Sequence, residues 1–130
     1  MKEIGGEIIA GIGVAAKAIK KQLPELQKYE PRLKECFCGT LNVLLEEPLF
    51  VRNWDVVTNP INWYDENQKN GEKFGLLSVV FFHRGLGTPA WIFDPHGSPH
   101  RNNPFIVEIL TRQIDAKLGD RCYIRIEQQT

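Results

Sequence analysis

Two short segments of this chain carry residues that could hold a phosphate-bearing ligand. The first is Gly11-Ile12-Gly13, where glycine lets backbone N–H groups approach phosphate oxygens without a Cβ in the way. The second is Gly39-Thr40-Leu41-Asn42-Val43. In an extended strand Thr40 and Asn42 point to the same side, and their neutral oxygens suit a hard cation such as Mg²⁺. Each motif is weak alone, and together they predict a site for a phosphate-bearing ligand.

Glu108 is a candidate ligand-binding carboxylate or base. It stands between Val107 and Ile109 in an apolar segment, so in a strand its carboxylate faces away from theirs. Such a carboxylate could accept a hydrogen bond from a ligand or act as a base near a reacting hydroxyl. It could equally be a solvated strand residue, and the sequence leaves both interpretations open.

A histidine-containing loop is a third candidate. His96 and His100 share one proline-rich segment with Asp94, and a loop of this kind could close over a ligand. Their spacing matches no zinc-binding template, so the sequence does not favour a metal site there.

Composition limits the classes of partner. The 130 residues are enough for one domain with a single core, and we expect residues 1–130 to form it. Sixteen basic and sixteen acidic side chains give a net charge of zero, so no bulk attraction to nucleic acid or membranes is expected. No apolar run approaches the roughly 18 residues of a membrane span. The odd set of three cysteines favours free thiols and a cytoplasmic protein.

The elements that must position these residues are mostly short strands. Apolar and β-branched runs, separated by Gly, Pro and Asn clusters, predict a compact β-barrel or sandwich. The segment Val14–Lys21 is expected to form a helical cover, Gly85–Pro89 a turn and Asp94–Pro104 a loop. The predicted strands are Glu7–Ala10, Phe37–Leu45, Phe74–His83, Ala90–Phe93, Phe105–Leu110 and Arg121–Glu127.

The order of these motifs resembles the archaeal-type CTP-dependent riboflavin kinases. The segments that carry the resemblance are Gly6-Glu7-Ile8-Ile9-Ala10-Gly11-Ile12-Gly13, Gly39-Thr40-Leu41-Asn42-Val43, Ile106-Val107-Glu108-Ile109 and Leu118-Gly119-Asp120. The resemblance extends from about Gly6 to Glu127. It implies a mainly β fold, a six-stranded cradle-loop (RIFT-like) barrel with short helical covers.

The resemblance also implies an activity, the transfer of the γ-phosphoryl group of CTP to riboflavin, giving FMN and CDP. Thr40 and Asn42 would hold Mg²⁺, and Glu108 and His100 would contact the flavin. Trp54, Trp63 and Trp91 are more typical of a core or edge than of flavin stacking. The residues implied for the nucleotide loop are Gly11, Ile12, Gly13, Val14, Ala15 and Ala16.

Two departures from the family pattern bear on nucleotide binding. Ala15 stands where the family has the third glycine of the loop, and the segment from Ile109 to Asp120 is shorter than expected. These departures keep an alternative open, a non-catalytic barrel of the same fold that binds a nucleotide or a flavin. A third interpretation is an interaction module like other cradle-loop barrels, some of which bind DNA, but the zero net charge argues against DNA binding.

Overall fold

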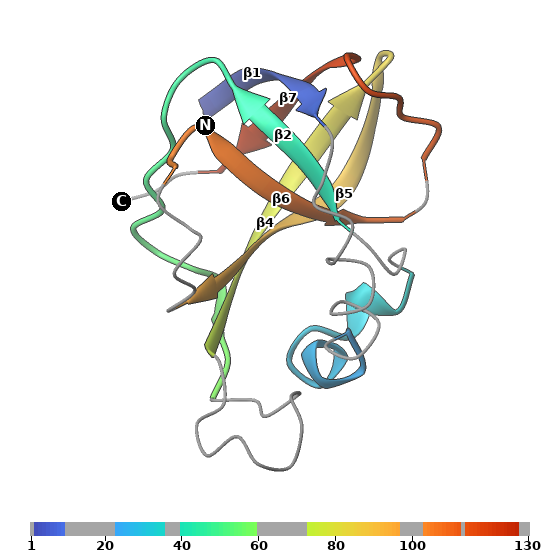
Figure 1. The fold of residues 1–130 in the computed structure, drawn as a ribbon. Coiled ribbons are helices and arrows are strands. Elements are labelled where there is room, and N and C mark those ends of the chain that lie inside the picture. The colour runs from blue at the N-terminus through green and yellow to red at the C-terminus, as the bar shows by residue number, and fades with distance from the viewer. Residues whose placement is uncertain are drawn as a thin grey trace.

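Six strands of the described residues close into an antiparallel barrel, as the sequence and the resemblance predict (Figure 1). The computed structural model describes residues 2–9, 23–35, 40–59, 73–96, 103–112 and 114–127. The strand order in the barrel is β4-β5-β6-β2-β1-β7, and pairing of β7 with β4 closes it. The short strand β3 pairs with the beginning of β4. The strands are β1 Lys2–Ile9, β2 Leu41–Leu45, β3 Val56–Val57, β4 Lys73–His83, β5 Leu86–His96, β6 Ile106–Thr111 and β7 Arg121–Ile126.

The inside of the barrel is the main apolar core. Every second residue of each strand points inward, because successive side chains of a strand face opposite sides. In β7, for example, Cys122, Ile124 and Ile126 are buried and the residues between them are exposed or partly exposed. The inward residues of the other strands are Ile4, Ile8, Val43, Leu45, Leu77, Val79, Phe81, Ala90, Ile92, Val107 and Ile109.

The long hairpin of β4 and β5 corrects one predicted turn. The expected turn Gly85–Pro89 is wrong, since the chain reverses at Arg84 and Gly85, with φ of 53° and 78°, and β5 begins at Leu86. Positive φ at both central residues matches the twist of a two-residue hairpin, and glycine adopts it at little cost. Pro89 has no backbone N–H to donate to a neighbouring strand. It is tolerated within β5 because pairing with β6 begins only at the next residue, Ala90.

The first strand begins at Lys2 rather than at the predicted Glu7. Gly6 explains the difference. A Cβ at Gly6 would lie 2.7 Å from Val43 Cγ1 and 2.8 Å from the Leu44 carbonyl oxygen. Glycine here therefore allows close approach of β2 instead of ending the strand.

A second apolar cluster lies outside the barrel. Residues 23–29 are helical, and the 3₁₀ helix η1 (Pro31–Glu35) follows directly. Leu26 and Leu33 of these segments are fully buried against the outer face of β4, β5 and β6. The helical cover appears at one end of the barrel in Figure 1. The other members of this cluster are Leu23, Phe74, Leu76, Trp91, Phe93 and Leu110.

The short helical covers of the predicted fold are therefore confirmed, although Val14–Lys21 lies outside the described residues. Over the part of the chain that the structure describes, no helix is both long and apolar enough to cross a membrane.

Candidate functional site

Thr40 and Asn42 point to the same side of the chain, as the sequence predicts. Asn42 lies in β2, and Thr40 is the residue immediately before this strand. Val43 and Leu45 fill the barrel, so the alternation turns Asn42 and Thr40 toward the outer face. The side-chain oxygens of Thr40 and Asn42, which are the proposed cation ligands, therefore lie on the same face at the start of β2.

Both oxygens are buried and unpaired. Thr40 Oγ1 and Asn42 Oδ1 have almost no solvent-accessible surface, and the structure gives neither a hydrogen-bond partner among the residues it describes. Buried polar side-chain atoms are paired in the large majority of cases, and an unpaired one costs about 1–3 kcal/mol. Such a cost at two neighbouring oxygens is typical of a site that a ligand completes.

Thr111 Oγ1 is also buried and unpaired within the described residues. It is a useful comparison, because it lacks the second unpaired oxygen that Thr40 and Asn42 provide for each other. Thr111 lies opposite Ala90 and has the parity of Val107 and Ile109, so it points into the barrel. It has no unpaired polar neighbour of this kind on its own strand. An isolated unpaired hydroxyl is therefore not enough to indicate a ligand site.

Glu108 joins Thr40 and Asn42 on the outer face. In the ladder between β2 and β6, Asn42 lies directly opposite Glu108, and both side chains face out of the barrel. Directly opposed residues have Cβ atoms about 4.5–5.5 Å apart. The sequence placed Glu108 at the flavin and Asn42 at the metal, and the fold brings them side by side. We call Thr40, Asn42 and Glu108 the outer polar cluster.

The outer polar cluster borders the apolar cover. On β5, Phe93 lies opposite Glu108, and Phe93 is buried beneath the helical segments together with Leu110. On the other side, Asn42 pairs with Ile9, the last residue of β1. The sequence continues from Ile9 directly into the predicted glycine loop. The outer polar cluster therefore lies next to the strand end from which that loop departs.

Several predicted site residues are not among those the structure describes. The flavin-binding prediction for His100 falls there, and so does the whole predicted nucleotide loop. These predictions stay untested. The loop residues concerned are Gly11, Ile12, Gly13, Val14, Ala15 and Ala16.

The outer polar cluster suits magnesium better than a transition metal. Within the described ranges, no three His, Cys, Asp or Glu side chains gather as a metal site. The cluster instead offers one hydroxyl, one amide oxygen and one carboxylate. Mg²⁺ prefers oxygen ligands and keeps several waters, with one or two protein ligands and the phosphates of a nucleotide. The donor set fits a nucleotide-bound Mg²⁺.

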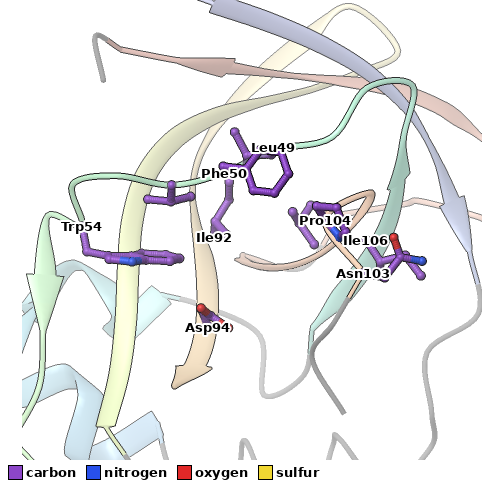
Figure 2. A pocket seen from close by; sticks show the side chains of 10 residues that line it. Leu49, Phe50, Trp54, Ile92, Asp94, Asn103, Pro104 and Ile106 are labelled. Atoms are coloured by element: carbon purple, nitrogen blue, oxygen red, sulfur yellow. The ribbon is translucent and has the colours of Figure 1, made fainter. Parts of the chain in front are cut away.

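A pocket opens beside the outer polar cluster, near the start of β6 and the end of β5 (Figure 2). Its volume is about 470 Å³, within the usual range of roughly 300–1,000 Å³ for small-molecule sites. Figure 2 shows Trp54 and Ile92 on one side of it, Pro104 and Ile106 on the other, and Asp94 below them. We call it the mouth pocket. Its remaining lining residues are Leu49, Phe50, Val51, Asn103 and Val107.

Hydrogen bonds hold the walls of the mouth pocket. The Leu49 N–H donates to the Pro104 carbonyl at 2.9 Å, which ties the two lining segments together. The Asn103 side chain accepts from the Phe105 N–H at 2.9 Å and fixes the turn into β6. Asp55, next to Trp54, accepts from the Ser78 N–H at 2.7 Å. No sequence motif marked this pocket, since its residues come from three separate segments.

A buried histidine supports the β1 end of the site. His83 is 8% exposed, and its Nε2 donates to Asp120 Oδ2 at 2.8 Å. This bond is the main reason why the pKa of the Asp120 carboxyl is lowered, followed by the bond from the Lys117 N–H. The same turn holds β1, because Gly119 N–H donates to Ile8 O and Ile8 N–H donates to Asp120 O. The Gly119-Asp120 motif therefore has a positioning role one residue from the end of β1.

The chain matches no protein-family model and no curated protein sequence.

Proposed function

We propose that this protein is a riboflavin-kinase-like phosphotransferase that uses CTP and Mg²⁺ to convert riboflavin into FMN. The observation that carries the proposal is the outer polar cluster, in which two buried oxygens without a hydrogen-bond partner among the described residues stand beside a carboxylate. Phosphoryl transfer needs positioning and charge neutralisation more than covalent chemistry, so such a neutral pair is adequate. The choice of CTP and riboflavin follows the motif resemblance. The free, buried Cys122 thiol agrees with a cytoplasmic protein.

Each residue of the outer polar cluster has a role in this proposal. Thr40 Oγ1 and Asn42 Oδ1 would hold a magnesium ion, which would supply positive charge to neutralise the nucleotide phosphates. Glu108 faces the acceptor hydroxyl and takes its proton as the hydroxyl oxygen bonds to the γ-phosphorus. The bond from that phosphorus to the β–γ bridging oxygen breaks, and CDP leaves. The glycine loop after β1 supplies backbone N–H groups to the phosphates.

A second candidate is a non-catalytic barrel that binds a nucleotide or a flavin. Ala15 in place of a glycine and the short segment after Glu108 favour it, because both remove features that the resemblance associates with nucleotide binding. Binding without turnover distinguishes this candidate from the kinase.

The test is FMN formation by the purified full chain. Riboflavin is incubated with CTP, ATP or GTP, with Mg²⁺ or with EDTA, and FMN is separated by chromatography. We expect FMN with CTP and Mg²⁺, a loss of about a hundredfold in Asn42→Leu and in Glu108→Gln, and no loss in the control Thr111→Val. Absence of FMN with every donor overturns the proposal, and nucleotide-induced thermal stabilisation without FMN establishes the non-catalytic alternative.

A further inference from the structure

The mouth pocket has the chemistry of a site for a flat aromatic ring. Trp54 and Phe50 give it two aromatic side chains, and Phe50 is 71% exposed at its rim. A large aromatic side chain left in water at the edge of a pocket is typical of a binding surface. Leu49, Ile92 and Pro104 supply apolar walls. A planar ligand would bury these surfaces without disturbing the hydrogen bonds that hold the walls.

The polar groups of the mouth pocket specify the edge of that ring. Asp94 offers carboxylate oxygens, which accept hydrogen bonds from ring N–H groups. Asn103 uses its Oδ1 to accept from the Phe105 N–H, which leaves the amide nitrogen as the donor of this side chain. The mouth pocket therefore offers both an acceptor and a donor to the polar atoms of a heteroaromatic ring.

The mouth pocket and the outer polar cluster meet at one strand. Ile106 and Val107 line the pocket; Val107 faces the barrel core, whereas Ile106 and Glu108, two residues apart in β6, both face out of the barrel. Asp94 likewise follows Phe93, which lies opposite Glu108. A substrate with a ring in the pocket and a flexible polyhydroxyl chain could therefore cross the rim and present a hydroxyl to Glu108.

We propose that the mouth pocket binds the planar heteroaromatic ring of the acceptor substrate, with the N–H and C=O edge on Asp94 and Asn103 and a ring face against Trp54. The identity of the ring rests on the proposed function, and the site itself rests on the pocket. In this arrangement Glu108 acts on the hydroxyl chain and the mouth pocket selects the ring.

The experiment uses lumichrome, an alloxazine ring without the hydroxyl chain, so that binding is separated from phosphoryl transfer. Its fluorescence is titrated with the full-length protein. We expect saturable binding that weakens about tenfold in Asp94→Ala, because a hydrogen bond to a charged group is lost, and about tenfold in Trp54→Leu, because stacking is lost. The matched control is Glu47→Ala, which removes an exposed carboxylate that lies outside the pocket lining and should change nothing.

The outcomes separate this inference from the kinase proposal. Lumichrome binding with the predicted variant pattern supports the mouth pocket even where no FMN forms. No saturable binding, or binding that Asp94→Ala and Trp54→Leu leave unchanged, overturns the inference even where FMN forms. Urea unfolding checks each variant, and if Asp94→Ala does not fold, Trp54→Leu carries the test.

Discussion

Replacing Thr40 with valine should leave the ligand-free protein as stable as the wild type, or more stable by about 1 kcal/mol. Thr40 Oγ1 is buried and makes no hydrogen bond to any described group, so its desolvation is uncompensated. Valine has nearly the same shape and lacks the hydroxyl. The substitution should therefore remove a cost of folding, and it also removes one of the two proposed metal ligands.

Thr58→Val is the matched control with the opposite sign. Thr58 is 2% exposed, and its Oγ1 accepts from the Phe74 N–H at 3.0 Å. Valine at position 58 leaves the backbone N–H of Phe74, a fully buried residue, without this hydrogen bond. We expect a loss of about 1–3 kcal/mol in the free energy of unfolding. The same chemical change should thus stabilise or spare one site and destabilise the other.

Urea unfolding in EDTA, followed by circular dichroism, measures both variants. A thermal shift with CTP and Mg²⁺ is the second readout, because a ligand that binds the native state raises its stability. We expect Thr40→Val to lose this shift and Thr58→Val to keep it. A destabilisation of Thr40→Val as large as that of Thr58→Val would show that Thr40 Oγ1 has a partner, and the argument for the outer polar cluster would fail.

Three further predictions concern stability and reactivity. Leu26→Ala should lower the free energy of unfolding by about 2–5 kcal/mol, because Leu26 of the helical cover is fully buried against the barrel. Leu118 is 68% exposed, so Leu118→Ala should change the free energy of unfolding by less than about 0.5 kcal/mol. Equal urea midpoints for the two variants would contradict the packing described. The lowered pKa of Asp120 means that its contribution to stability is complete above its ordinary value of 3.8 and is lost as the pH falls through the lower folded pKa. Urea midpoints measured from pH 5 to pH 2 should therefore fall less steeply in Asp120→Asn, and identical slopes would count against this. Burial raises the pKa of the Cys122 thiol to about 11, so iodoacetamide at pH 8 should label it in urea and not in the native protein, as peptide mapping can check.

The strand pattern of this fold could be predicted from the sequence because it depends on local alternation. Alternation predicts that Thr40 and Asn42 point to the same side, and the structure confirms this, with Leu41 and Val43 facing the core. Predicted strand ends were less accurate. Gly6 was taken to precede a strand, and in the fold it lies within β1, where neighbouring strands approach closely. Whether a glycine ends a strand or allows close packing depends on residues distant in the sequence.

The composition of the site could be predicted only in part, for the same reason. The sequence singled out Asn42 and Glu108 separately, but their pairing depends on the register of two strands more than 60 residues apart. The mouth pocket was missed entirely. Trp54 packs at the edge of the core, as the sequence predicts, but its place in a pocket across from Pro104 follows from how loops cross the barrel end. Local periodicity carries no information about such crossings.

The most direct test of the outer polar cluster as a metal site is a crystal structure of the protein with CTP and Mn²⁺ in place of Mg²⁺. Anomalous scattering locates the manganese independently of the surrounding atoms. We predict one peak bound by Thr40 Oγ1, Asn42 Oδ1 and the nucleotide phosphates. A nucleotide-bound manganese elsewhere on the barrel, with these two oxygens still unliganded, would contradict the proposed function.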